Sequence, residues 1–179
     1  MRVVGGMYKR RLITYPDDAK HIRPTKDRVR EAIFSALGDL TNYQGLDLYS
    51  GSGAMGIEGL SRGCSFMIFV DNNKIAIETT KKNIESLNIK NAEIMFKNDF
   101  DALEDFKKNK KVFDIAFLDP PYKEGKYEQL VDYFLDNNLL STNGIMVLES
   151  DRDINIDESL FQKVRKYKYG DIKVMIMWR

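Results

Sequence analysis

The 179-residue sequence has one cysteine, Cys64, and one histidine, His21. A lone cysteine excludes an internal disulfide, and together the two residues are too few for a zinc site. Cys64 falls between an expected helix and an expected strand, which is typical of a structural residue rather than a nucleophile. We therefore expect neither a metal site nor a disulfide framework.

Long apolar runs are also missing from the chain. No stretch of about 18 apolar residues occurs, so no membrane-spanning helix is expected. Residues 1–6 lack the apolar core of a signal peptide. By default we expect a cytoplasmic location. The 43% apolar content is ordinary for one globular domain with a substantial core.

The net charge of +1 conceals an uneven distribution of charged residues. Residues 1–30 contain nine Lys and Arg but only three acids, a net +6, so the remaining residues sum to −5. A basic arm of this kind is typical of contact with phosphate groups, although an ordinary solvated surface would look the same. A second basic cluster is equally well explained as the polar face of a strand; it comprises Lys163, Arg165, Lys166 and Lys168.

Apolar runs alternate with amphipathic segments from residue 45 onward. Strands are expected near 45–49, 66–70, 92–96, 112–118 and 144–149, with helices near 54–62, 73–87, 99–108 and 124–138. The alternation predicts an α/β fold with a mostly parallel sheet covered on both faces. A short helix near 157–162 and a hairpin of 164–169 with 173–178 should add one antiparallel strand. Residues 1–22 predict a small basic β-hairpin extension, and residues 23–179 the main domain, which opens with a helix near 26–37.

A glycine-rich turn follows the first expected strand. Gly51, Gly53 and Gly56 fit G-x-G-x-x-G, and Asp71 ends the next strand twenty residues after Gly51, where an acid can accept hydrogen bonds from ribose. A dinucleotide would place its pyrophosphate at the helix N-terminus. Asp47, four residues before Gly51, would repel that pyrophosphate but suits a ligand with ammonium and sulfonium groups, as in S-adenosylmethionine. A capping role for Asp47 stays open.

The stretch Asp119-Pro120-Pro121-Tyr122 ends the apolar run 112–118. Proline cannot continue a sheet ladder, so this backbone is rigid and has free carbonyls. The Asp119 carboxylate and the Pro120 carbonyl could accept both N–H groups of an exocyclic base amine, while Tyr122 stacks on the base. Such acceptors favour the pyramidal amine that attacks a methyl group and stabilise charge that appears only in the transition state. A proline-rich turn capped by Asp119 is the simpler alternative.

Asp99 and Phe100 follow the third expected strand, where they could contact the amino group and ring of an adenine. Alone, they would be an ordinary turn. Their position links them to the other motifs, because Asp47, Asp71, Asp99 and Asp119 follow four successive strands. Ligands of such sheets bind at the carboxyl ends of the strands, so one shared site is predicted there.

The chain resembles the class I S-adenosylmethionine-dependent methyltransferases and, more narrowly, the bacterial 16S ribosomal RNA (guanine-N2)-methyltransferases of the RsmD type. The resemblance extends over nearly the whole chain and is carried by RVVGGMYKRRL (2–12), RPTKDRVREAIF (23–34), DLYSGSGAMG (47–56) and LDPPY (118–122). The LDPPY stretch is shared by enzymes that act on adenine, cytosine or guanine amines. The stretches 2–12 and 23–34 are more specific to the RsmD type. Ser50 departs from the Ala or Cys that is more usual there.

The resemblance implies a Rossmann-like class I methyltransferase fold with a seven-stranded sheet, and a site divided into three parts. The part that binds S-adenosylmethionine would comprise Asp47, Tyr49, Gly51, Ser52, Gly53, Asp71, Asn72, Asp99 and Phe100. The catalytic part would comprise Asp119, Pro120, Pro121 and Tyr122. The part near the RNA or the cofactor carboxylate would comprise Arg10, Arg11, Arg23, Thr25 and Arg28.

The resemblance also implies a substrate, a guanine of small-subunit ribosomal RNA that is methylated at N2 by direct in-line transfer, free or in an assembling 30S particle. An adenine-N6 or cytosine-N4 methyltransferase is the nearest alternative, although the chain has no separate DNA-reading domain. A nucleotide-dependent oxidoreductase and a non-catalytic RNA-binding protein of ribosome assembly are the others. No obligate protein partner is evident.

Overall fold

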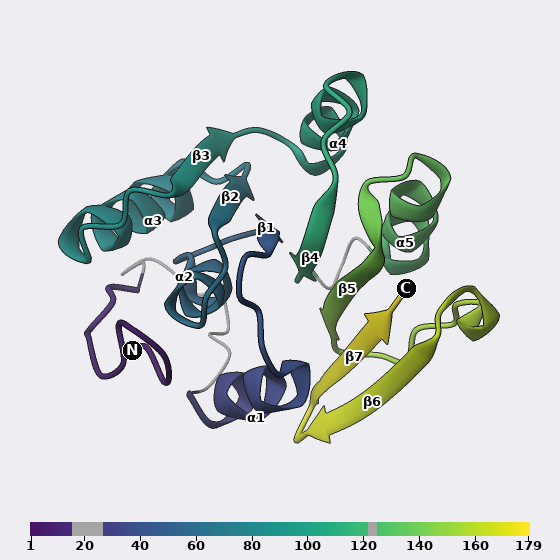
Figure 1. Cartoon of the computed structure of the whole chain (residues 1–179), viewed down its shortest axis with the longest axis horizontal. Coiled ribbons are helices and arrows are strands. Elements are labelled where there is room, and N and C mark those ends of the chain that lie inside the picture. Colours follow the sequence, from purple (N-terminus) through teal and green to yellow (C-terminus); the bar gives the residue numbers. More distant parts are fainter. Residues whose placement is uncertain (16–26, 122–124) are drawn as a thin grey trace.

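The computed structural model describes residues 1–15, 27–121 and 125–179, and their seven strands form one sheet in the order β3-β2-β1-β4-β5-β7-β6 (Figure 1). The strands are β1 (Gln44–Leu48), β2 (Phe66–Asp71), β3 (Ala92–Phe96), β4 (Phe113–Leu118), β5 (Leu140–Ser150), β6 (Lys163–Tyr169) and β7 (Ile172–Trp178). The helices are α1 (Asp27–Leu37), α2 (Ala54–Ser61), α3 (Lys74–Ser86), α4 (Asp99–Lys108), α5 (Tyr127–Asp136) and the 3₁₀ turn η2 (Glu158–Leu160).

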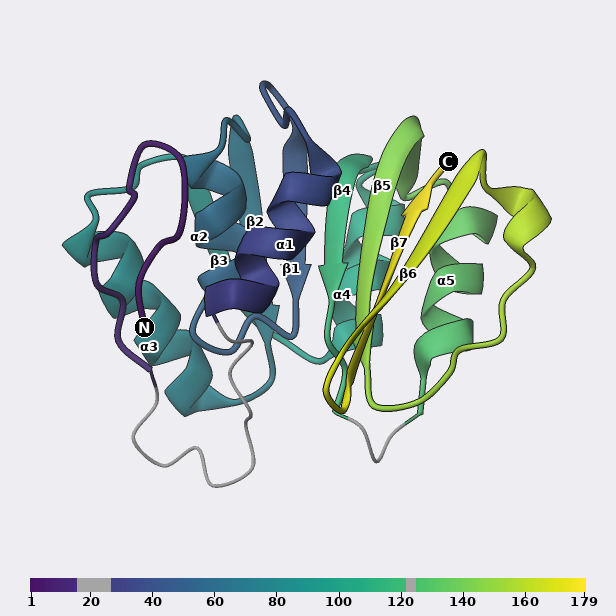
Figure 2. The same ribbon diagram turned by 90° about the horizontal axis from the view of Figure 1, so that it is seen from below.

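The predicted mixed sheet is confirmed. β1 pairs in parallel with β2 and β4, β3 pairs in parallel with β2, and β5 pairs in parallel with β4. Only β7 runs antiparallel to its neighbours β5 and β6. Helices α1, α2 and α3 cover one face, and α4 and α5 cover the other, as Figure 2 shows from below. Within the described ranges, no helix is long and apolar enough to cross a membrane.

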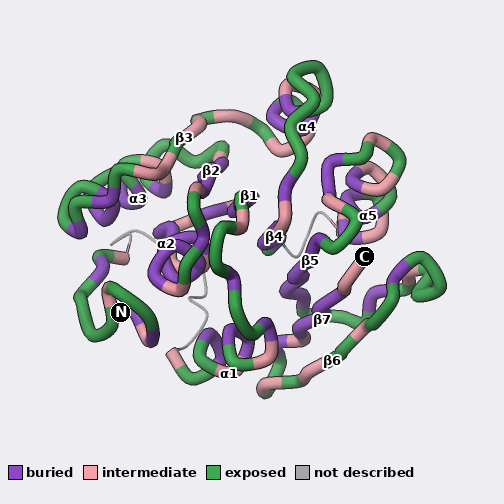
Figure 3. Tube along the Cα trace, in the orientation of Figure 1, coloured by how far each residue is buried: buried purple, intermediate pink, exposed green. Residues whose placement is uncertain are grey.

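The central strands are buried on both faces, which explains their continuous apolar sequences (Figure 3). Alternate side chains point to opposite faces. Ile115 and Phe117 of β4 therefore join the core under α1–α3, while Ala116 and Leu118 join the core under α4 and α5. This alternation also decides to which face the acids at the strand ends point.

The N-terminal segment forms a short hairpin-like pairing around the antiparallel bridge of Arg2 and Leu12. The amides of Val3, Arg10 and Ile13 donate to the carbonyls of Arg11, Val3 and Met1. The turn between the two arms contacts α2, where the Met7 amide donates to the Ser61 carbonyl at 2.7 Å. A Cβ on Gly6, whose φ is 69°, would lie 1.7 Å from that carbonyl oxygen, so only glycine fits. The expected boundary between residues 22 and 23 lies outside the described residues.

Candidate active site

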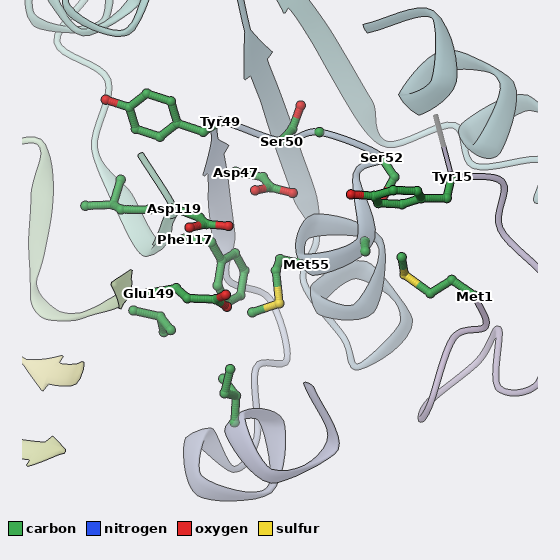
Figure 4. A pocket seen from close by; sticks show the side chains of 15 residues that line it. Met1, Tyr15, Asp47, Tyr49, Ser50, Ser52, Met55, Phe117, Asp119 and Glu149 are labelled. Carbon is green, nitrogen blue, oxygen red and sulfur yellow. The ribbon is translucent and has the colours of Figure 1, made fainter. Parts of the chain in front are cut away.

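A pocket opens at the carboxyl ends of the central strands (Figure 4). It brings together the glycine turn after β1, the end of β4 and the end of β5. Its lining consists of Met1, Tyr15, Ile33, Asp47, Tyr49, Ser50, Gly51, Ser52, Ala54, Met55, Phe117, Leu118, Asp119, Val147 and Glu149. Five of the residues predicted for the site are among them: Asp47, Tyr49, Gly51, Ser52 and Asp119.

The glycine turn has the backbone that its sequence predicts. Tyr49, Gly51 and Gly53 have φ angles of 71°, 55° and 77°, in the left-handed region, and α2 begins directly after them. The third glycine has a different role. A Cβ on Gly56 would lie 2.4 Å from Cε1 of Phe69, so glycine lets α2 pack closely on β2.

Asp47 is 4% exposed and lines the pocket from beneath the turn. Its Oδ2 accepts a hydrogen bond from the Gly56 amide at 2.8 Å, so the capping role is present as well. Burial and then the charge of Asp71 raise the pKa of Asp47 to about 7, although the Gly56 hydrogen bond acts to lower it. A carboxyl with that pKa is ionised readily by a neighbouring cation.

Asp71 and Asn72, predicted to hold a ribose, do not line this pocket. The two carboxylate oxygens of Asp71 accept the amides of Gly51 and Asn73, each at 2.8 Å. The carboxylate thus fixes the glycine turn against the end of β2. Asn72 is exposed, and its amide donates to the Asn98 side chain at 3.3 Å. Their contact with a ribose stays a prediction.

Asp99 and Phe100 lie further along the same edge, at the start of α4. Asp99 accepts hydrogen bonds from the Tyr49 hydroxyl at 2.6 Å and from Lys126 at 3.1 Å. Burial acts to raise the pKa of Asp99, but Tyr49, the Phe100 amide and Lys126 together lower it. Tyr49 therefore links the glycine turn to the third predicted acid, while contact of Asp99 and Phe100 with an adenine stays a prediction.

Asp119 extends from the end of β4 into the pocket, where Pro120 is buried and Pro121 exposed. Burial, followed by the charges of Glu149 and Asp47, raises the pKa of Asp119 well above its ordinary value. Because the residue as a whole is exposed, repulsion by the two other carboxylates is the cause that the geometry supports most directly. Tyr122, Arg23 and Thr25, three further residues predicted for the site, lie outside the described residues.

Two ionisable side chains of the pocket, those of Glu149 and Tyr15, were not predicted. Glu149 follows the apolar run of β5, so the pattern of an acid at the end of an apolar strand is present on this strand as well. Tyr15 reaches the pocket from the N-terminal segment (Figure 4), and no pattern in the sequence indicates this. Burial and then the charge of Asp119 raise the pKa of Tyr15 to about 12, so its hydroxyl stays protonated.

Asn83 of α3 connects the N-terminal segment to the glycine turn. Its Nδ2 donates to the carbonyls of Thr14 at 2.9 Å and Ser52 at 2.8 Å, and its Oδ1 accepts the Thr14 amide at 2.7 Å. The side chain is 1% exposed. One buried amide thus holds both the basic segment and the wall of the pocket.

The basic residues of the N-terminal region divide into two groups. Arg10 and Arg28 are exposed around a shallow surface hollow that Arg2 and Lys9 also line, and Arg11 is exposed nearby. Arg30, counted in the basic arm, is instead fully buried and pairs with Asp27 at 3.0 Å. It acts as a structural residue because its guanidinium also donates to the Arg2 carbonyl.

The second basic cluster lies on the edge strand β6. Lys163 and Arg165 lie over the Trp178 ring, and Lys166 pairs with Glu158 at 2.5 Å. These contacts agree with the polar face of a strand. In the part of the chain that the structure describes, no group of three or more His, Cys, Asp or Glu could hold a metal ion.

Comparisons with known proteins agree with this geometry. The family model described as Conserved hypothetical protein 95 matches residues 1–178. The putative rRNA methyltransferase YlbH of Bacillus subtilis is 38% identical over 95% of this chain and 94% of its own length. Ribosomal RNA small subunit methyltransferase D of Escherichia coli K12 is 31% identical over 84% of this chain and 75% of its own.

A solved structure, the putative methyltransferase yhhF from Escherichia coli, superposes with a TM-score of 0.86 at 28% identity, covering all of this chain and 97% of that one. The resemblance noted in the sequence is therefore confirmed. The chain belongs to the Conserved hypothetical protein 95 family, that of the RsmD-type ribosomal RNA methyltransferases, and has their class I methyltransferase fold.

Proposed function

We propose that this protein transfers a methyl group from S-adenosylmethionine to the N2 amine of a guanine in small-subunit ribosomal RNA. The observation that carries the proposal is that Asp119 and the glycine turn above Asp47 face one pocket. An acceptor for a base amine thus lies opposite a place for a cationic cofactor. Family membership supports the same reading.

The residues of the pocket fit S-adenosylmethionine, which when bound supplies an activated methyl group next to a positive charge. Asp47 is buried with a raised pKa, so a cation beside it would hold its carboxylate in the ionised form. The left-handed backbone at Gly51 leaves open space where a side chain would start, with no atom within 4 Å of a Cβ placed there. The turn therefore lets a ligand approach its backbone closely.

In the proposed reaction, Asp119 and the Pro120 carbonyl accept the two N–H groups of the amine and aim its lone pair at the methyl carbon. A bound S-adenosylmethionine would supply this methyl carbon to the nitrogen and keep the electron pair of the broken carbon–sulfur bond. The amine proton then passes to Asp119, whose raised pKa suits it to accept a proton, and from there to water. Holding amine and methyl in line is the main contribution of the pocket.

A guanine must leave its stack to enter such a pocket, which costs roughly a few kcal/mol and is easiest in a loop. The exposed arginines of the N-terminal segment would bind the phosphates around it. The substrate is small-subunit ribosomal RNA, free or in an assembling 30S particle. For such a substrate the proposed location is the cytoplasm.

Nucleoside analysis tests the proposal. Small subunits from cells that lack the protein are incubated with it and methyl-labelled S-adenosylmethionine, and their RNA is digested. We expect label in N2-methylguanosine and a single methylated position on mapping. Label in N6-methyladenosine or N4-methylcytidine would favour an adenine-N6 or cytosine-N4 methyltransferase. If no small-subunit substrate is labelled, the result would favour a non-catalytic RNA-binding protein.

Replacing Arg10 and Arg11 together by glutamine is expected to raise the apparent KM for RNA. Each phosphate that an arginine no longer neutralises should lower the slope of log KM against log salt by about 0.7–0.9. Steady-state kinetics between 50 and 200 mM salt measure the slope, and Lys110→Gln, just after the end of α4, is the control. If the slope of log KM against log salt is unchanged, Arg10 and Arg11 do not contact the RNA.

Replacing Asn83 by alanine is expected to loosen both the N-terminal segment and the glycine turn. The variant cannot form the three side-chain hydrogen bonds of Asn83, and the buried Ser52 carbonyl loses its bond to this side chain, so the free energy of unfolding should fall by about 1–3 kcal/mol. The affinity for S-adenosylhomocysteine should fall as well, because Ser52 is no longer held. Calorimetric titration measures the affinity, and Asn91→Ala, which removes a hydrogen bond to the Ser65 carbonyl, is the matched control. Unaltered affinity in the Asn83 variant would mean that the turn holds its shape without this link.

A further inference from the structure

Glu149 belongs to the pocket, yet the proposed chemistry does not use it. It is the second-last residue of β5, and its side chain is 5% exposed. Leu118 lies beside Leu148 in the parallel register of β4 and β5, so Asp119 and Glu149 follow at the same level. Two residues further back on each strand, Phe117 and Val147 also line the pocket.

Strand alternation explains why the two acids share a face. Phe117 and Val147 both belong to the core under α1–α3, and residues two positions further along a strand point to the same side. Figure 4 shows the carboxyl groups of Asp119 and Glu149 extending from neighbouring strands toward the same space. A base whose amine reaches Asp119 would thus present the adjacent part of its edge to Glu149.

The two carboxylates require a particular hydrogen-bonding pattern from that base. Ionised carboxylates only accept hydrogen bonds. Two neighbouring donors on the edge of the base would therefore favour the ionised form of both acids against their mutual repulsion. In guanine the N2 amine lies next to N1–H, which is a second donor. In adenine the N6 amine lies next to N1, and in cytosine the N4 amine lies next to N3, and both of these ring nitrogens are acceptors.

We propose that Glu149 selects guanine by accepting the N1–H group while Asp119 accepts the N2 amine. The proposal rests on the function proposed above and supplies the base identity that Asp119-Pro120-Pro121-Tyr122 leaves open. An adenine or cytosine in the same position would set a ring lone pair against a buried carboxylate. When a site is built to accept an N–H group, an analogue without that group reacts much more slowly, by about 10⁴-fold.

The base 2-aminopurine tests this contact, because it keeps the amine at C2 but has an acceptor at N1. It also lacks O6, a difference that is the same for the wild type and for every variant, so the comparison between proteins isolates the contact at N1. Small subunits are reconstituted with RNA carrying either guanine or 2-aminopurine at the mapped position, and kcat/KM for methyl transfer is measured on both. The wild-type protein should prefer guanine by about 10³-fold or more. In Glu149→Gln the amide can accept from N1–H or donate to N1, so the preference should fall below about tenfold, with kcat/KM on guanine lowered about 10–100-fold.

Two controls separate selection from structural damage. Glu93→Gln makes the same change on the exposed surface of β3 and should leave the preference unaltered. The thermal shift caused by S-adenosylhomocysteine should be equal in Glu149→Gln and wild type, since the proposal gives Glu149 no contact with the cofactor. An absent thermal shift in the variant would overturn the proposal by assigning Glu149 to the cofactor.

The results distinguish this proposal from the one on which it rests. If the wild-type protein methylates guanine and Glu149→Gln keeps the full preference over 2-aminopurine, the assignment of Glu149 is wrong and the proposed function stands. If the wild-type protein methylates no guanine, the proposed function itself is wrong. A collapsed preference with an intact thermal shift supports both.

Discussion

Asp119→Ala should lower kcat for methyl transfer by about 10²–10⁴-fold while S-adenosylhomocysteine binds nearly as before. The change removes the acceptor that orients the amine and receives its proton, whereas the glycine turn and Asp47 remain. The loss should therefore appear in kcat rather than in cofactor affinity. Single-turnover kinetics with saturating cofactor measure the first quantity, and titration calorimetry measures the second.

The same variant should fold at least as well as the wild type. Asp119 is held next to Glu149 and Asp47, and their charges contribute to its raised pKa, so its removal relieves repulsion. Asp132→Ala, at an exposed position of α5, is the control for loss of a carboxylate. Retained turnover in Asp119→Ala would exclude the proposed catalytic role, and an unfolded variant would show that Asp119 is structural.

Asp47→Asn is expected to stabilise the protein without ligand and to abolish cofactor binding. Asparagine keeps an oxygen for the Gly56 amide but removes the buried charge. A difference of one in pKa corresponds to about 1.4 kcal/mol. The rise from 3.8 to about 7 therefore costs the ionised protein on the order of 4 kcal/mol, as an upper estimate. Chemical unfolding at pH 8 should show a gain of about 1–4 kcal/mol in the variant.

The pH dependence of this effect has a defined sign. The folded protein binds a proton at Asp47 that the unfolded chain releases, because the folded pKa is the higher of the two. The contribution of Asp47 to stability is therefore fully present below about pH 4 and is lost as the pH rises to about 7. In Asp47→Asn, the fall of the unfolding free energy that Asp47 causes between about pH 4 and pH 7 should be absent.

Cofactor binding should show the opposite trend. A cation favours ionised Asp47, so the affinity for S-adenosylmethionine should rise between pH 6 and pH 8 in the wild type. At a concentration 100 times its Kd, the cofactor should stabilise the wild type by about 2.7 kcal/mol and Asp47→Asn by almost nothing. Asp114→Asn is a matched control, because Asp114 also accepts a backbone amide, that of Gln44, at the other end of the sheet. If the cofactor stabilises Asp47→Asn and the wild type equally, Asp47 does not contact the cofactor.

Much of the architecture could be predicted from local patterns. Apolar runs that end in an acid placed Asp47, Asp71 and Asp119 at strand ends, and the spacing of Gly51 and Gly53 placed a turn before a helix. These features depend on residues close in sequence, so composition and periodicity reveal them. The pairing of the N-terminal segment with itself was also predictable, but its contact with α2 was not, because the amides of Val4 and Met7 bond to Glu58 and Ser61, far away in the chain.

Which of the four acids line the pocket could not be predicted. From the sequence, Asp47, Asp71, Asp99 and Asp119 are all expected at one shared site. In the fold, β1 lies between β2 and β4, and Asp71 and Asp99 accept hydrogen bonds from Gly51 and Tyr49. Asp47 and Asp119 instead face the pocket together with an acid from β5.

Local patterns in the sequence are enough to establish that the chain alternates strands and helices, that acids and glycines gather at one sheet edge, and to which family it belongs. The three-dimensional fold was needed to show that Glu149 joins Asp119 and that Asn83 links the N-terminal segment to the glycine turn. It also decided that Asp47 is buried enough to titrate near neutral pH. The reason is physical: the contacts of these three residues and the burial of Asp47 arise from strand order and packing between segments 30 to 70 residues apart, which no local pattern encodes.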